Sequence, residues 1–373
     1  MTTVPVPEKS SSNFTDWLKR AWRSVSVPLV AVLLALLIGA IILLVSGANP
    51  IQAYAALFEG AFGSPAAIQR TLEKATPLIF SGLAVAFAFK AGLFNIGAQG
   101  QLLIGAIVAA WVGYSIEGLP AIIHAPLALL AGAAAGALYG AIPGALKAFT
   151  GAHEVITTIM LNYIAINFTD FLADGILKDT SQGNVVARTP HILPSAELPI
   201  WGYVPLGFLM AIVAAVLVWW VLYRTTLGYE IRTVGLSSSA AQYAGINVAR
   251  IIILAMAISG LLAGFGGAVE TQGIVGRFQP GFNVGLGFDG ITVALLGKTS
   301  PFGVIPASIV LGAMRAGSSQ MQFSAGVAKE ITDVITAFIL FFVAADTIIK
   351  TLLRQQDTED DKVNLSTGWG ANS

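Results

Sequence analysis

Long apolar runs separated by short polar stretches constrain this chain more than any single motif does. Residues 29–45 form an unbroken apolar run, and comparable runs recur as far as residue 349. Such runs cross a lipid bilayer as helices, because a helix satisfies its own backbone hydrogen bonds in hydrocarbon. Charged residues make up 11% of the chain, whereas a typical soluble domain has about 25%. The sequence therefore predicts an all-α polytopic membrane protein.

The runs predict about ten transmembrane helices. A signal peptide is the alternative for the first run, but that run exceeds the usual apolar core of about 7–15 residues. The expected helices are 29–45, 77–89, 102–116, 121–146, 154–173, 204–223, 251–270, 290–297, 301–317 and 330–349.

Basic residues favour one side of this arrangement, which places both termini in the cytoplasm. The expected domains are a cytoplasmic segment at 1–27, a membrane domain at 28–350 and a polar cytoplasmic tail at 351–373.

A polar interruption at residues 90–101 divides two apolar segments. It holds three glycines and the amide side chains of Asn95, Gln99 and Gln101, with no acid nearby. Irregular polar backbone survives at membrane depth only against protein or a water-filled path. We therefore expect an interrupted helix beside a translocation path. The alternative is a short cytoplasmic turn between two helices.

Two halves of the chain also resemble each other. Three pairs of short segments match in the same order, and in the expected topology the paired elements run in opposite directions, as in an inverted repeat. The repeat pairs the interruption at 90–101 with a second irregular stretch at 271–290, which predicts two interrupted helices. The matched pairs are 79–83 with 258–261, 144–148 with 312–316, and 154–157 with 330–332.

Glycine recurs every fourth residue within the expected helix 121–146. This spacing puts the glycines on one face, where a neighbouring backbone can approach closely, so we expect a role in helix packing. They are Gly132, Gly136, Gly140 and Gly144.

Several kinds of chemistry have no support in the sequence. The chain has no cysteine and three histidines far apart in sequence, so we expect no metal site. The tripeptide Gly297-Lys298-Thr299 is not a phosphate loop, because position 292 is Thr where that loop needs Gly. No catalytic constellation stands out, and the net charge of zero argues against a nucleic-acid partner. An intramembrane enzyme is the least favoured reading.

Two acids, Asp289 and Asp333, lie deepest in the expected helices. Such residues are candidates for a functional charge. The alternative is a structural ion pair with Arg315 or Lys298.

The polar loop 224–250 contains a short capped helix. Ser237 or Ser238 can cap it, and Gly245 can end it. A small helix of this kind suits a socket on a cytoplasmic partner, although an ordinary connector is the alternative. The expected contact residues are Ser238, Ala240, Ala241, Tyr243 and Gly245.

Two motifs carry a resemblance to a known family. Residues 92–101, Gly-Leu-Phe-Asn-Ile-Gly-Ala-Gln-Gly-Gln, resemble the signature of the branched-chain amino-acid and simple-sugar permeases of ABC importers. Residues 153–163, His-Glu-Val-Ile-Thr-Thr-Ile-Met-Leu-Asn-Tyr, are similar to the longer permease subunit of its nucleoside branch. That branch usually has glutamate where this chain has Gln99, and the ribose-type signature Gly-Ile-Asp-Leu-Ser is absent. The loop 224–250 looks like the coupling loop of such permeases.

The resemblance implies a permease subunit of a nucleoside importer in the bacterial inner membrane, without a nucleotide site or bound cofactor of its own. Its implied partners are a separate ATPase that uses ATP, a second permease that is usually a paralogue, and an extracytoplasmic binding protein or lipoprotein. The alternatives are a simple-sugar permease of the ribose type and an ion-coupled secondary transporter or channel. Amides suit a neutral, hydroxyl-rich solute, and the expected path residues are Asn95, Gln99, Gln101, Asn162, Asn283 and Asp289.

Overall fold

The chain folds into a bundle of helices with one two-stranded hairpin. The computed structural model describes residues 14–181, 183–281 and 285–345, with side chains from residue 26 onward. The main helices are α1 (Phe14–Val45), α2 (Pro50–Phe62), α3 (Pro65–Lys90), α4 (Ala98–Ser115), α5 (Ala121–Thr150), α6 (Glu154–Asp174), α7 (Leu206–Arg224), α8 (Thr226–Leu236), α9 (Ser238–Tyr243), α10 (Val248–Glu270), α11 (Leu286–Leu296), α12 (Pro301–Ala325) and α13 (Glu330–Ala344).

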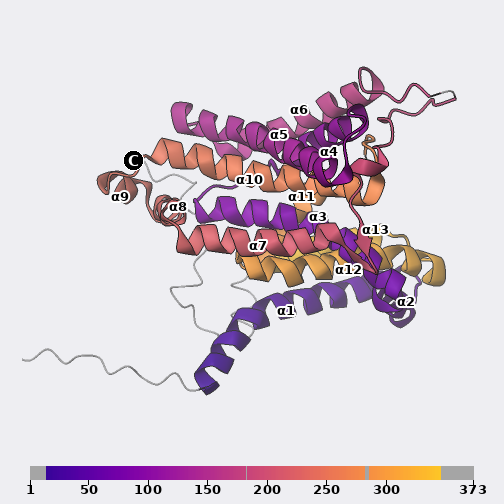
Figure 1. The fold of residues 1–373 in the computed structure, drawn as a ribbon. Coiled ribbons are helices and arrows are strands. Elements are labelled where there is room, and N and C mark those ends of the chain that lie inside the picture. The colour runs from indigo at the N-terminus through magenta and orange to yellow at the C-terminus, as the bar shows by residue number, and fades with distance from the viewer. Residues whose placement is uncertain (1–13, 182, 282–284, 346–373) are drawn as a thin grey trace, which may run out of the picture.

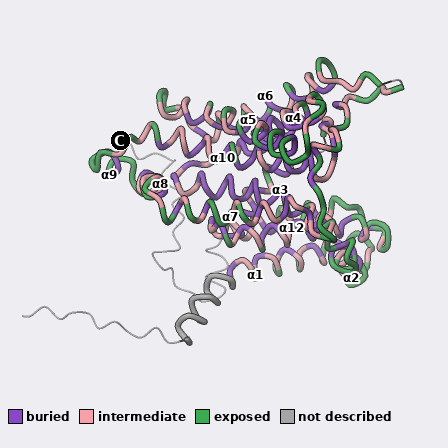
Figure 2. The backbone as a smooth tube through the Cα atoms, in the orientation of Figure 1, coloured by how far each residue is buried: buried purple, intermediate pink, exposed green. Residues whose placement is uncertain are grey.

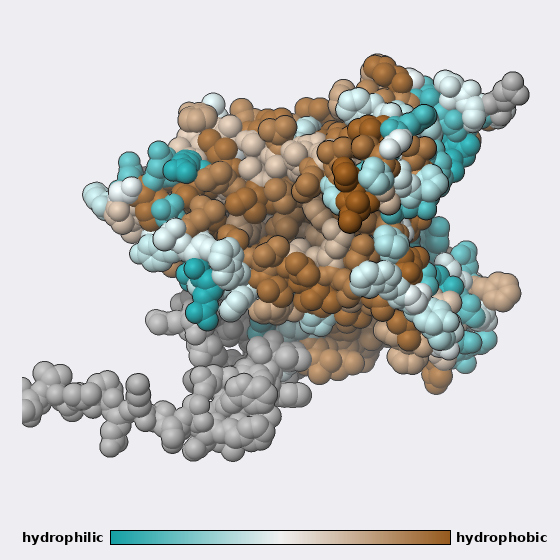
Figure 3. All heavy atoms as spheres, in the orientation of Figure 1, coloured by the Kyte–Doolittle hydropathy of each residue, from teal (hydrophilic) through white to brown (hydrophobic). Residues whose placement is uncertain are grey.

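On the face of the bundle shown in Figure 3, an apolar band lies between two polar ends. Large apolar side chains lie exposed along it, among them Ile122, Leu138 and Phe149. Within the described residues, seven helices are long and apolar enough to cross a membrane. Exposed apolar surface on this scale is stable only against lipid or another chain. The protein is therefore an all-α, multi-pass membrane protein.

The two ends of the bundle differ in structure. At one end, which we call the α9 end, α8 and α9 project from the bundle (Figure 1). At the other, the hairpin end, a long loop carries a 3₁₀ turn at Pro194–Ala196 and strands β1 (Ile200–Trp201) and β2 (Val204–Pro205). The strands pair antiparallel, with Trp201 opposite Val204.

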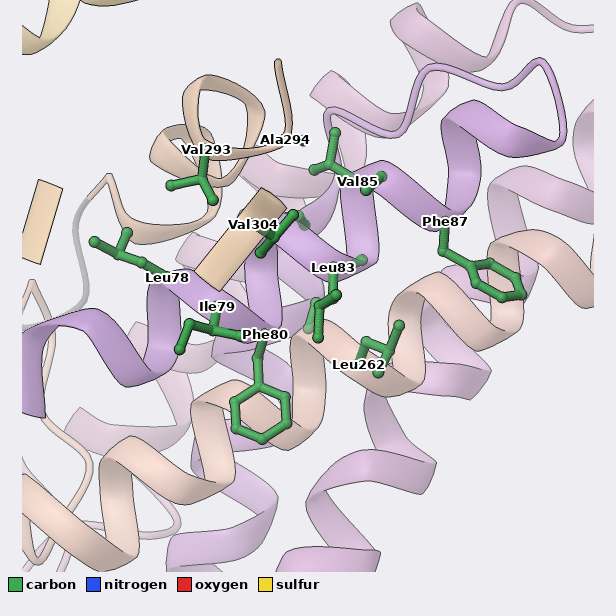
Figure 4. Packing of buried hydrophobic residues seen from close by; sticks show 14 of the residues in the cluster. Leu78, Ile79, Phe80, Leu83, Val85, Phe87, Leu262, Val293, Ala294 and Val304 are labelled. Atoms are coloured by element: carbon green, nitrogen blue, oxygen red, sulfur yellow. The ribbon is translucent and has the colours of Figure 1, made fainter. Parts of the chain in front are cut away.

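Helix α3 lies at the centre of the bundle (Figure 2). It packs against α2, α7, α10, α11 and α12. The core around it includes Leu78, Ile79, Phe80 and Leu83, which meet Leu262 of α10, Val293 of α11 and Val304 of α12 (Figure 4). Because lipid tails are as apolar as these side chains, close packing rather than removal from water holds such helices together.

The prediction of a short span at 77–89 is wrong. Helix α3 begins at Pro65, where Ser64 accepts a hydrogen bond from the Ala67 N–H at 3.1 Å, and it continues through Pro77 for 26 residues in all. The charged residues Arg70, Glu73 and Lys74, which precede the expected span, lie within the first three turns of the same helix. Residues 50–62, which lie between the first two expected helices, form α2.

The glycines of α5 face α10. A Cβ atom at Gly136 would lie 2.4 Å from the Gly260 carbonyl oxygen, and one at Gly140 would lie 2.6 Å from that of Met256. Real Cβ atoms are not found so close to backbone oxygens. Gly132 approaches α4 and α10, and Gly144 approaches α10, in the same way. The two backbones therefore touch along this face, a packing mode that only small residues allow.

The stretch after α10 is more regular than the sequence indicated. Residues Thr271–Val275 continue α10 as a π-helix, which ends at Gly276 in the left-handed region (φ +72°). The Gln272 side chain donates to the backbone carbonyls of Ala125 and Ala196, which supports the wider turn from outside. A loop then leads to α11.

Candidate functional site

The segment between α3 and α4, residues 91–97, has no exposed residue. After Lys90 the chain turns at Gly92, whose φ of +70° favours glycine. A Cβ atom at Gly92 would also lie 3.1 Å from the backbone of Gly235 in α8. Helix α4 then starts at Ala98, so Gln99 and Gln101 lie in its first turn rather than in the loop.

Four amide side chains meet around this segment, and we call Asn95, Gln99, Gln101 and Asn162 the amide cluster. Each is at most 2% exposed. Asn95 Nδ2 donates to Gln101 Oε1 at 2.9 Å and to Ser259 Oγ of α10 at 2.8 Å. Its Oδ1 accepts from the Gly97 N–H at 2.9 Å. Asn95 therefore ties the loop to both α4 and α10.

Asn162 and Gln99 satisfy backbone groups that have no partner within a helix. Asn162 of α6 accepts from the Gly100 N–H at 2.8 Å and donates to the Ile96 carbonyl at 2.9 Å. Gln99 Oε1 accepts from the Gly287 N–H at 2.8 Å, in the first turn of α11. The first turns of α4 and α11 thus lie side by side, and each receives a cap from a side chain outside itself.

The six expected path residues therefore separate into three groups. Asn95, Gln99, Gln101 and Asn162 come together, and they make hydrogen bonds with each other, with Ser259 and with the backbone. Asn283 lies outside the described residues. Asp289 pairs with Arg315. That any of these residues contacts a solute stays a prediction.

The ion pair between Asp289 and Arg315 joins α11 to α12. Arg315 donates from Nε and Nη2 to the same Asp289 oxygen, at 3.0 and 2.6 Å. The side chains are 26% and 21% exposed, for Arg315 and Asp289 respectively. The sequence left open whether Asp289 is a functional charge or pairs with Arg315 or Lys298. In the structure it pairs with Arg315. Asp333, the other deep acid, is exposed in the first turn of α13.

The short helix expected in loop 224–250 is α9. Ser237 caps it, with its Oγ accepting from the Ala240 N–H at 3.2 Å, and Gly245 follows it with a φ of +81°. Ala241 is fully buried beneath the helix, whereas Tyr243 is 94% exposed. One face of α9 is thus anchored and the other presents an aromatic ring.

A hollow of about 640 Å³ opens beside α9. It is lined by the end of α5, the turn after it, α9 and the start of α10, including Lys147, Gly151, Ser239, Gln242 and Asn247. Lys147 also donates to the buried Glu154 carboxylate at 2.5 Å, which fastens the start of α6 to α5. The α9 end therefore presents a hollow and, beside it, the projecting ring of Tyr243.

One acid at a predicted helix end is buried rather than solvated. Glu270, at the last residue of α10, is 4% exposed, and its Oε2 atom has no hydrogen-bond partner among the described residues. The position looked like an ordinary helix end, where a solvated carboxylate is common. The available signal was its location in an apolar stretch with no basic residue within four positions on either side. Among the described residues, no group of His, Asp and Glu could hold a metal ion.

Comparison with known proteins identifies the family. The family described as "Branched-chain amino acid transport system / permease component" matches residues 67–344. The chain belongs to this family. The resemblance drawn from residues 92–101 and 153–163 is thereby confirmed.

Relatives in this permease family align over most of the chain. It is 43% identical to the guanosine ABC transporter permease protein NupP of Bacillus subtilis, over 88% of this chain and 95% of that protein. It is 40% identical to the nucleoside ABC transporter permease protein NupB of Lactococcus lactis, over 89% and 93%. It is 33% identical to the glucose ABC transporter permease protein TsgB13 of Haloferax volcanii, over 88% and 90%. The two bacteria also have more distant relatives, NupQ at 30% and NupC at 29% identity. These relatives are transport components rather than enzymes.

Proposed function

We propose that this permease is one membrane subunit of an ABC importer for nucleosides. The observation that carries the coupling role is α9, a capped helix anchored by Ala241, which presents Tyr243 beside an open hollow. An ATPase that docks there can push on α9, the start of α10 and the end of α5 together, because these elements line the hollow. The nucleoside assignment is supported by the names of the two relatives at 40% identity or more.

The same comparison supports one of the proposed partners. Two bacteria each have two relatives of this chain, NupP with NupQ and NupB with NupC. This pairing supports a second permease that is a paralogue. We propose that the remaining partners are a separate ATPase at the α9 end and an extracytoplasmic binding protein or lipoprotein at the hairpin end. The ATPase uses the ATP, and this chain binds no cofactor. The protein then lies in a bacterial inner membrane with both termini in the cytoplasm.

We also propose how the membrane domain is built. It has about ten spans, of which two are interrupted helices. An inverted repeat would relate the α3–α4 segment to the stretch that leads into α11. The adjacent first turns of α4 and α11, joined by the hydrogen bond from Gly287 to Gln99, support that relation. Corresponding interrupted segments that meet inside the membrane are typical of transporter sites.

A substitution at the exposed face of α9 tests the coupling role. Tyr243→Glu leaves the buried side of the helix intact, so we expect an assembled transporter whose solute-stimulated ATP hydrolysis falls by about tenfold or more, as loss of an aromatic interface anchor allows. Tyr243→Phe, which keeps the exposed aromatic ring, is the matched control and should retain most of the stimulated hydrolysis. Normal stimulated hydrolysis in Tyr243→Glu would contradict the assignment.

The solute class is tested by reconstitution with the co-purifying subunits. Labelled guanosine, ribose and glucose are supplied separately with the binding protein, with and without ATP. Uptake of guanosine that requires ATP supports the proposal. Uptake of a sugar alone would reassign the solute, and guanosine uptake without ATP that collapses with an ion gradient would favour a secondary transporter.

A further inference from the structure

A contact between two backbones joins α8 to the start of the segment between α3 and α4. A Cβ atom at Gly235 would lie 2.9 Å from the carbonyl carbon of Ala91 and 2.9 Å from the nitrogen of Gly92. A Cβ atom at Gly92 would lie 3.1 Å from the Cα atom of Gly235. We call Gly92 and Gly235 the glycine joint. Because no side chain lies between the two elements there, no change of rotamer can absorb a displacement of one against the other.

Helices α8 and α9 form one corner at the α9 end. Helix α8 lies beside the end of α3 and leads directly into α9 (Figure 1). The Ser237 N–H donates to the Thr233 carbonyl of α8 at 3.0 Å, and the Ser237 Oγ accepts from the Ala240 N–H of α9 at 3.2 Å. Gly235 precedes Ser237 by two positions (237 − 235). A movement of α9 therefore carries Gly235 with it.

The segment at residues 91–97 cannot yield toward solvent. None of its residues is exposed. The Leu93 N–H donates to the Ala88 carbonyl at 3.1 Å, which also fastens the segment to the end of α3. Protein interiors are close-packed and transmit strain. A displacement at Gly92 is therefore passed along the segment.

The amide cluster fastens the far end of the segment and the first turn of α4 to three other helices. These helices are α6, α10 and α11. The link to α11 is also steric, because a Cβ atom at Gly287 would lie 2.7 Å from the carbonyl carbon of Ala98, where α4 begins. The first turns of α4 and α11 therefore move when the segment moves.

We propose that the glycine joint transmits the movement of α9 to this segment and, through it, to the first turns of α4 and α11. This inference rests on the proposed docking of an ATPase at α9. Gly92 and Gly235 are positioning residues, which act through the elements that they join. Coupling between two sites is reciprocal, so the joint also conveys the arrival of the solute to the ATPase.

The test uses the complete transporter in proteoliposomes, with its binding protein and guanosine. Gly235→Ala puts a methyl group between the two backbones and forces them apart. The amount of guanosine moved per ATP hydrolysed should fall about fivefold or more, within the range of typical coupling factors, whereas hydrolysis without guanosine should stay near the wild-type rate. A role in packing alone would lower the Tm and the yield of assembled transporter but leave this ratio unchanged.

Gly317→Ala is the matched control. A methyl group there meets the Leu57 backbone of α2 in the same way, away from the glycine joint. Both variants should lower the Tm, but only Gly235→Ala should lower the ratio of transport to hydrolysis. An equal ratio in the two variants would overturn the proposal and leave α10, which reaches the segment through Ser259, as the route.

The corner between α8 and α9 gives a second pair of variants that crowd nothing. Ser237 is exposed. Ser237→Gly should fold, because glycine is tolerated as an N-cap, yet it removes the capping hydroxyl and loosens the corner. Ser237→Thr keeps the hydroxyl and should move more guanosine per ATP than Ser237→Gly does. Equal ratios for these two variants would overturn the proposal even where Gly235→Ala fails to assemble.

A fluorescent label on α11 reports movement without relying on transport. Phe288→Cys places a thiol next to Gly287, at a side chain that is 43% exposed, and the chain has no other cysteine. A bimane label on this thiol, in a complex whose other subunits are free of reactive cysteines, should change its emission maximum when ATP and vanadate are added. Gly235→Ala should abolish that change. No change in the otherwise wild-type chain, or the same change in both, would overturn the proposal.

Tyr243→Glu separates the failure of this inference from the failure of the proposed function. Normal stimulated hydrolysis in Tyr243→Glu would refute the docking of an ATPase at α9. Loss of stimulated hydrolysis in Tyr243→Glu, together with an unchanged ratio of transport to hydrolysis in Gly235→Ala, would leave the docking in place and overturn only the role of the glycine joint.

Discussion

Substitution of Asn162 by Leu tests whether the amide cluster supports the fold. The change removes two hydrogen bonds, from the Gly100 N–H at 2.8 Å and to the Ile96 carbonyl at 2.9 Å, and leaves both backbone groups buried. An unsatisfied buried group costs about 1–3 kcal/mol, but polar contacts between membrane helices average about 0.6 kcal/mol and reach about 1.7. We therefore expect a loss of about 2 kcal/mol in the free energy of unfolding.

Thermal unfolding of the purified protein in detergent measures this loss. At roughly 2–4 °C per kcal/mol, the Tm of Asn162→Leu should fall by about 4–8 °C. Asn167→Leu is a matched control on the same helix, because Asn167 is exposed and bonds only to the Tyr163 carbonyl one turn before it. Its Tm should stay near that of the wild type. Equal Tm values for the two variants would refute the idea that Asn162 caps the loop and α4.

Two further predictions concern helix packing and a buried charge. Gly136→Leu puts side-chain atoms where the α10 backbone lies, so its Tm should fall by several degrees. Gly273→Leu should be tolerated better, because the nearest atom is 3.7 Å from the Cβ position there. Equal falls in Tm would argue against tight contact between α5 and α10. Lys147→Met strands the Glu154 carboxylate, whose side chain is 3% exposed, whereas Glu154→Gln frees a lysine that is 27% exposed and can reach water. Lys147→Met should therefore lower the Tm more than Glu154→Gln does, and the reverse order would contradict this account.

The sequence was sufficient for those features that depend on local pattern. Apolar runs predicted a helical membrane protein, and the motif around Asn95 predicted its family. The spacing of Ser237 and Gly245 predicted a short helix between them, because capping and the left-handed conformation act over a few residues.

Features that depend on tertiary contact were harder to predict. The length of α3 was missed because Arg70, Glu73 and Lys74 were read as marks of an aqueous loop. The role of Gln99 as a cap for α11 could not be foreseen, since Gly287 is 188 residues away. Glu270 was passed over for the same reason, as its surroundings come from other helices.

The central place of α3 has a consequence for how the protein is made. This helix leaves the ribosome early, yet α10, α11 and α12, which cover much of it, are synthesised much later. Its charged first turns therefore wait in the membrane, or at the insertion machinery, without their final neighbours. A nascent chain that stops after α9 would leave α3 covered only in part, by α2 and α7 among its larger neighbours. The packing around the central helix is thus complete only after α12 has been made.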